Sequence, residues 1–117
     1  MPDDKLSRLL SRFAVATKAH QEALEAMDEE RANSHARIIA GLIESIVREG
    51  TAGREGLLAL VDNDDKVVSG MAAIFSLSYS PQRCEAVLRR LAAEPGLLGF
   101  RAGVALQRWE EGTWEGS

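Results

Sequence analysis

The stretch from Asp64 to Leu77 constrains the fold of this chain more than any other part of the sequence. Read as a helix, it carries apolar side chains on two of its faces, and the polar residues in its body are Lys66, Ser69 and Ser76. A helix that is apolar nearly all round is covered by other helices rather than lying on a surface. The stretch therefore predicts a core helix on which the other helices pack. Its two apolar faces comprise Val68, Met71, Ala72 and Phe75, and Val67, Gly70, Ile74 and Leu77.

Composition and pattern favour helices elsewhere in the chain as well. Only 5% of the 117 residues are aromatic, whereas β-sandwiches favour aromatic and β-branched residues. No segment alternates strictly between apolar and polar residues, so the sequence predicts no sheet. A chain of this length forms one domain on ordinary priors, and we expect a single all-α domain over residues 1–117.

Two longer helices are predicted in the first half of the chain. The first begins at Asp3 or Asp4, and its apolar stripe recurs at steps of three and four residues. We prefer a break near Asp28, with Asp28 as the N-cap of the second helix, over one continuous helix of about 45 residues. Gly50 is the predicted left-handed end of the second helix. The stripe of the first helix comprises Leu6, Leu10, Phe13, Thr17, His20, Leu24 and Met27.

Four shorter helices follow, which makes about six in all. The first of them is expected over residues 52–61, and the second is the core stretch, capped by Asp64 or Asp65. The third is expected to begin at Ser80-Pro81 and to end at Pro95-Gly96, and the fourth to cover residues 97–110. Short connections place successive helices antiparallel, and hairpins in series predict an α–α superhelix. Residues 113–117 are expected to form a frayed tail.

The segment GLLALVDNDDKVVSGMAAIFSL resembles a HEAT-type repeat, in which leucines precede an Asp-rich turn and the second helix carries Val and paired small residues. Ser69 departs from the pattern, because such repeats often carry Arg at that position. The matching residues are Leu57, Leu58, Leu60, Asp62, Asp65, Val68, Ala72 and Ala73. The resemblance implies hairpin repeats of the HEAT kind.

Over about residues 6–112 the whole chain resembles a small bacterial family, domain-of-unknown-function family number two thousand and nineteen. The resemblance rests on Asn33, on the leucine–aspartate repeat and on the ending Pro95-Gly96, Gly99-Phe100, Ala102, Leu106, Trp109 and Gly112. It implies an α–α superhelix and assigns no catalytic residue. Small HEAT-like proteins of this kind are mostly scaffolds or binders, and some immunity proteins of bacterial toxins look similar.

Charge and cysteine content narrow the class of partner and the compartment. The net charge is −4, and the region Asp28–Asp65 alone carries nine acids against four bases. An acidic chain is a poor general binder of phosphate backbones. The single cysteine, Cys84, excludes an intramolecular disulfide, and neither a signal-peptide core nor an apolar run of about 18 residues is present. These features predict a cytoplasmic protein with no membrane partner.

The sequence predicts no catalytic, cofactor-binding or metal-binding residue. His20 and His35 lie on apolar stripes near acidic residues, but their spacing matches no metal motif, and partly buried histidines are the favoured interpretation. Cys84 is expected to be a small buried residue rather than a nucleophile. The cluster from Asp62 to Asp65 is expected to be a capping turn rather than a calcium loop.

The predicted function is that of a non-enzymatic, helical-repeat, protein-binding module. One alternative is an immunity-type protein that neutralises a toxin through the acidic region; the other is a nucleic-acid binder or HEAT-like base-processing enzyme that uses the C-terminal arginines. A solvated arginine face, with Arg90 and Arg101 paired to Glu94, is favoured over an arginine binding surface. The sequence does not decide whether the protein forms a homodimer. Candidate contact residues are Asp28, Glu29, Glu30, Arg89, Arg90, Arg101, Arg108 and Trp114.

Overall fold

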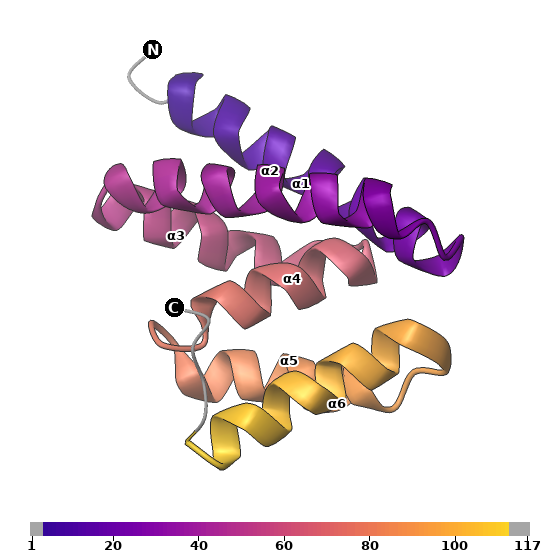
Figure 1. Cartoon of the computed structure of the whole chain (residues 1–117). Coiled ribbons are helices and arrows are strands. Elements are labelled where there is room, and N and C mark those ends of the chain that lie inside the picture. The colour runs from indigo at the N-terminus through magenta and orange to yellow at the C-terminus, as the bar shows by residue number, and fades with distance from the viewer. Residues whose placement is uncertain (1–3, 113–117) are drawn as a thin grey trace. The chain divides into compact units, whose positions relative to one another are not determined.

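The computed structural model describes residues 4–112, and over this range it contains six α-helices, one short 3-10 helix and no strand (Figure 1). The predictions of an all-α chain and of about six helices are therefore confirmed. In chain order the elements are α1 (Asp4–Glu25), α2 (Glu29–Arg48), α3 (Thr51–Ala59), η1 (Leu60–Asp62), α4 (Lys66–Ser76), α5 (Pro81–Ala92) and α6 (Gly96–Glu110).

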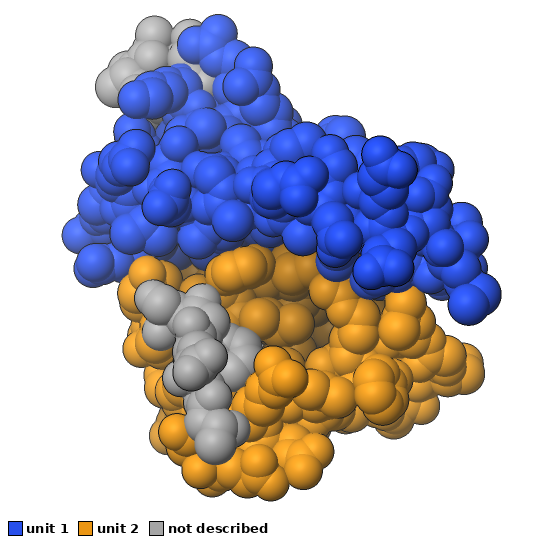
Figure 2. Space-filling view, in the orientation of Figure 1, with its two compact units in different colours: residues 1–57 blue, residues 58–117 orange. Residues whose placement is uncertain are grey.

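Contacts within the chain group it into two compact units, residues 1–57 and residues 58–117, which are coloured separately in Figure 2. Unit 1 contains α1, α2 and most of α3, and unit 2 contains η1, α4, α5 and α6. Each unit has its own set of buried apolar side chains.

In unit 1, α1 and α2 are two separate helices that pack against each other as a hairpin. The chain turns at Met27, whose φ of 58° is left-handed. Asp28 then caps α2, because its carboxylate accepts a hydrogen bond from the Arg31 backbone N–H at 3.1 Å. The predicted break and the predicted N-cap are confirmed. The prediction that Met27 lies on the buried stripe was wrong: it is 90% exposed, because it belongs to the turn and not to the helix.

The core of unit 1 lies between its helices and includes the fully buried side chains of Phe13, Ala23, Ile46 and Leu57. As predicted, α2 ends before Gly50, whose φ of 71° is left-handed.

In unit 2, α4 contacts η1, α5 and α6. Val68, Ala72, Ala73 and Leu77 are completely buried, as expected for a helix covered on more than one side. Gly70 allows α5 to approach α4 closely: a Cβ added there would lie 3.1 Å from Cδ1 of Leu91. Within this unit, the prediction of a core helix is confirmed.

The two serines in the body of α4 are buried rather than exposed. Ser69 Oγ donates a hydrogen bond to the Val61 carbonyl at 2.6 Å and so ties α4 to η1. Ser76 Oγ has no hydrogen-bond partner among the described residues. The two serines therefore sit in different environments although they lie on one helix.

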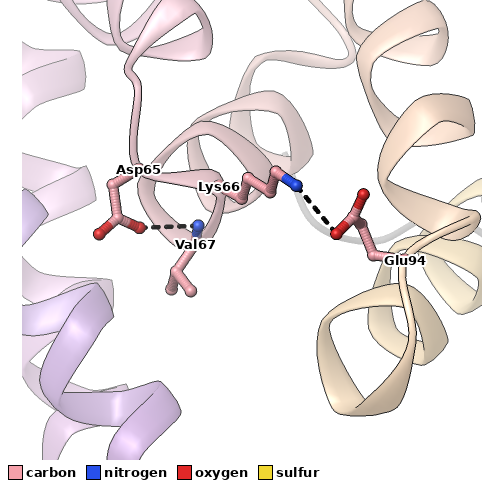
Figure 3. A network of polar contacts seen from close by, with 4 residues as sticks. All are labelled: Asp65, Lys66, Val67 and Glu94. Carbon is pink, nitrogen blue, oxygen red and sulfur yellow. Dashed lines mark hydrogen bonds and ion pairs between the residues drawn. The ribbon is translucent and has the colours of Figure 1, made fainter.

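The aspartate-rich segment before α4 is a capping turn, as predicted. Asn63 Oδ1 accepts a hydrogen bond from the Asp65 backbone N–H at 2.8 Å. Asp65 in turn accepts a hydrogen bond from the backbone N–H of Val67 at 2.8 Å (Figure 3). It also accepts one from the backbone N–H of Val68 at 3.3 Å. Two N–H groups of the first turn of α4 thus find their acceptor in the Asp65 carboxylate.

The helices α5 and α6 form a second hairpin, and two details differ from the predictions. Ser80 stands at the N-cap position before Pro81, but its side chain makes no capping hydrogen bond. Phe100, grouped by the sequence with the apolar residues of the last helix, is 68% exposed. The reason is helical geometry, because the buried residues Gly99, Ala102, Ala105 and Leu106 define a face from which Phe100 points away.

No described helix has both the length and the apolar character needed to cross a bilayer.

Candidate functional site

Cys84, near the N-terminus of α5, is completely buried. Burial raises the pKa of its thiol to about 11, although the nearby Arg83 guanidinium acts in the opposite direction. The thiol is therefore protonated at neutral pH and poorly suited to act as a nucleophile. The predicted burial of Cys84 is confirmed.

The two histidines lie in unit 1 and are both half-buried. His20 is on α1, and His35 is on α2 and lines a surface groove. Over residues 4–112, no group of three or more His, Cys, Asp or Glu side chains is placed to hold a metal ion. His35 thus forms part of the groove surface.

The arginines of α5 and α6 differ in their surroundings. Arg83 forms an ion pair with Asp62, and Arg89 forms ion pairs with Glu85 at 3.3 Å and Glu110 at 3.9 Å. Burial lowers the pKa of Arg101 from its usual value. Arg108 is exposed in the last turn of α6. Several of these guanidiniums are therefore already engaged within the protein.

Arg90 is the exception among them. The predicted ion pair between Arg90 and Glu94 is not formed; instead Lys66 of α4 contacts Glu94 at 2.9 Å (Figure 3). Arg90 makes no ion pair or side-chain hydrogen bond with any residue that the structure describes. Arg90 lines a surface cleft of unit 2. Arg90 is thus an available cation beside a concave surface.

The unit 2 cleft has a volume of about 430 Å³ and lies between the segment Val61–Ser69 and α5. One part of its lining is aliphatic and the other part is polar or charged. The lining residues are Val61, Asp62, Asn63, Lys66, Ser69, Val87, Arg90, Leu91 and Glu94.

A second concave surface, the unit 1 groove, lies between α1 and α2 and has a volume of about 450 Å³. Its lining is largely apolar, and Val15 and Ile38 within it are 68% and 49% exposed. Arg12 also lines the groove and makes no ion pair or side-chain hydrogen bond with any described residue. The full lining is Ser11, Arg12, Val15, Ala16, Ala19, His35, Ile38 and Leu42.

The acidic candidates at the start of α2 do not line this groove. Asp28 is engaged as a helix cap and contacts the Arg31 guanidinium at 3.8 Å. Glu29 and Glu30 are exposed and form no ion pair with a described residue. Trp114 lies outside the described residues. The structure thus distributes the predicted contact residues over several surfaces rather than assembling them into one.

The groove residues Val15 and Ile38 were not singled out by the sequence as contact residues, although it contained a signal for each. Val15 is a β-branched residue that falls outside the buried stripe of α1. Ile38 precedes Ile39, and two consecutive helical residues are about 100° apart, so both cannot point into the same core. In both cases the sequence signal of an exposed contact residue was a large aliphatic side chain outside the main apolar stripe of its helix.

A crystal structure of the protein RPA1889 from Rhodopseudomonas palustris has the same fold. It matches this chain with a TM-score of 0.85 at 21% sequence identity, covering 96% of this chain and 93% of that one. No family model matches the chain, and no curated protein matches it. The likeness shows the fold alone, and the resemblance to the domain-of-unknown-function family stays a prediction.

Proposed function

We propose that this protein is a non-enzymatic protein-binding module and that the unit 1 groove is its contact surface. The observation that carries the proposal is the exposure of two large aliphatic side chains, Val15 and Ile38, in one concave apolar surface. Apolar residues gathered on a surface mark interaction sites more often than scattered single residues do. Fully burying such a side chain contributes about 1.5–3 kcal/mol, so covering these two half-exposed residues would contribute roughly 2 kcal/mol.

The occupant that fits is an amphipathic helix of another protein. A groove between two packed helices accepts the ridge of a third, with apolar anchors spaced three and four residues apart. Charge adds a second condition, because Arg12 lines the groove and Arg8, one turn earlier on α1, likewise pairs with no described residue. We therefore expect an acidic residue beside the apolar stripe of the partner helix.

The immunity-type alternative has one observation in its favour. Glu29 and Glu30 are exposed at the start of α2 and form no ion pair with a described residue. A basic partner surface would find them available. The nucleic-acid alternative is weaker, because Arg83 and Arg89 are ion-paired, Arg101 is half-buried and the chain carries a net charge of −4.

The test begins with a photocrosslinking residue placed at position 15 in the native host, followed by purification of the captured protein. Binding of the two purified proteins is then measured by calorimetry for the native chain, for Val15→Asp and for Ala40→Asp. Ala40 is the matched control, because it is exposed on α2 but does not line the groove. We expect at least a tenfold loss of affinity for Val15→Asp, since a charge buried in an apolar contact is costly, and no loss for Ala40→Asp.

Two results would refute the proposal. Equal affinity for the native chain and Val15→Asp would mean that the groove is not the contact surface. A native chain that is dimeric by light scattering, and that Val15→Asp converts to a monomer, would show that a second copy of this chain occupies the groove. If Glu29→Lys with Glu30→Lys removes binding and Val15→Asp does not, the acidic surface and the immunity-type alternative are favoured instead.

A further inference from the structure

The unit 2 cleft differs from the unit 1 groove in its chemistry and shares no lining residue with it. We propose that this cleft binds a carboxylate group carried on an aliphatic chain, with Arg90 as the anchoring cation. The ligand class is a peptide segment that presents either its C-terminal carboxylate or an acidic side chain.

Ion pairs occupy most of the charged side chains that line the cleft. Its lining contains two acids, Asp62 and Glu94, and each already has a basic partner: Arg83 for Asp62, and Lys66 for Glu94 at 2.9 Å (Figure 3). Arg90 is left without a counter-charge among the described residues, although Glu94 lies one turn away on the chain. The lining holds two acids and two bases, and Arg90 is the one of these four charges without an ion-pair partner among the described residues, which favours an anion beside it.

Asn63 adds hydrogen-bond donors to those of Arg90 in the cleft lining. The Oδ1 atom of Asn63 accepts a hydrogen bond from the Asp65 backbone N–H at 2.8 Å, which fixes the orientation of this amide. Its Nδ2 group donates to no described residue, and Asn63 lines the same cleft as Arg90. A guanidinium and an amide N–H₂ together supply donors for both oxygens of a carboxylate.

The lining of the cleft favours a carboxylate over a phosphate. Arg90 is the one lining cation without an ion-pair partner among the described residues, so it can balance the single charge of a carboxylate but not both charges of a phosphate dianion. Val61, Val87 and Leu91 form the aliphatic floor of the cleft, and their small exposed parts, 2%, 5% and 7%, leave room for contact with a short alkyl group only. A singly charged carboxylate with a short aliphatic chain satisfies both conditions, whereas inorganic phosphate satisfies neither.

The experiment is a nuclear magnetic resonance titration of the full chain with N-acetyl-leucine, followed through backbone amide shifts. We expect saturable shifts at residues that line the cleft, and about fivefold weaker binding to Arg90→Gln, as is typical for the loss of one exposed charge-assisted contact. The control is Arg89→Gln, which removes a neighbouring exposed guanidinium that does not line the cleft and should leave the affinity unchanged.

Further probes separate the possible sources of the carboxylate. N-acetyl-leucinamide, which lacks the carboxylate, should bind far more weakly than N-acetyl-leucine. The α-amide of N-acetyl-glutamate presents only a side-chain carboxylate, so tighter binding of this compound would assign the site to acidic side chains, and weaker binding would assign it to chain ends.

Three results would overturn the proposal. They are the absence of saturable shifts with either carboxylate, equal affinity of Arg90→Gln and the native chain, and binding of inorganic phosphate at least as tight as that of the carboxylates. Because the unit 1 groove shares no residue with the cleft, each of these outcomes leaves the proposed protein-binding function untouched.

Discussion

Replacing Gly70 by leucine is the most direct test of the packing around α4. Gly70 is buried, and a Cβ added there would lie 3.1 Å from Cδ1 of Leu91 and 3.9 Å from Cδ1 of Leu98. The Cβ alone is therefore tight but tolerable if Leu91 shifts by a few tenths of an ångström. The remaining three carbon atoms of a leucine side chain would need space that the side chains of α5 and α6 already occupy.

The expected magnitude combines two opposing effects. Overpacking a core costs about 1–3 kcal/mol, and the short Cβ distance places this site near the upper end of that range. Leucine also has a higher helix propensity than glycine by about 0.8 kcal/mol, which offsets part of the cost. The net destabilisation is about 2 kcal/mol. With an unfolding entropy of about 0.25 kcal/mol/K for a chain of this length, the midpoint of thermal unfolding should fall by about 8 °C.

The assay is thermal and urea unfolding followed by circular dichroism, with Gly41→Leu as the matched control. Gly41 is an exposed residue of α2, and a Cβ added there meets no atom within 4 Å. The same substitution should therefore raise stability at position 41 by about 0.8 kcal/mol through helix propensity alone. If Gly70→Leu were neutral or stabilising like the control, the close packing of α4 against its neighbours in unit 2 would be refuted.

Three further predictions concern single contacts. Ser69→Ala should lower the free energy of unfolding by about 1 kcal/mol, measured in urea, because it removes the hydrogen bond to the Val61 carbonyl. Ser76→Ala should leave this free energy unchanged or raise it by about 0.5 kcal/mol, because Ser76 Oγ has no partner among the described residues. Equal effects of the two substitutions would refute the difference between the two serines. Cys84, with a pKa of about 11, should resist alkylation at pH 8 until urea unfolds the chain, and rapid labelling of the folded protein would contradict its burial. Asp28→Ala should cost about 1 kcal/mol as a lost N-cap, while Asp28→Asn should cost less; thermal unfolding of both variants measures the difference, and equal losses would point to the Arg31 ion pair instead.

Helix boundaries could be predicted because their signals are local. The caps Asp28 and Asp65, the left-handed Gly50 and the opening Pro81 act on backbone groups within a few residues, and each is found where the sequence places it. Such contacts depend little on the rest of the fold, so sequence reasoning reaches them.

The surfaces were harder to predict because they depend on competition between distant residues. The spacing of Arg90 and Glu94 favours an ion pair on one helix, but Lys66, 28 residues before Glu94, takes this carboxylate instead. The exposure of Val15 depends likewise on which sides of α1 its neighbours leave uncovered. Which of several compatible partners wins is decided by tertiary packing, and periodicity along the chain contains no information on that choice.

The turn at Met27 has a chemical consequence. Its thioether is 90% exposed, whereas that of Met71, within α4, is only 8% exposed. Oxidation converts a methionine into a polar sulfoxide, which is harmless in solvent and disruptive in a core. Mild peroxide should therefore modify Met27 first and leave the fold intact, while sulfoxide at Met71 should accumulate only as the chain opens. The ratio of the two products, read by mass spectrometry, would record how often unit 2 unfolds.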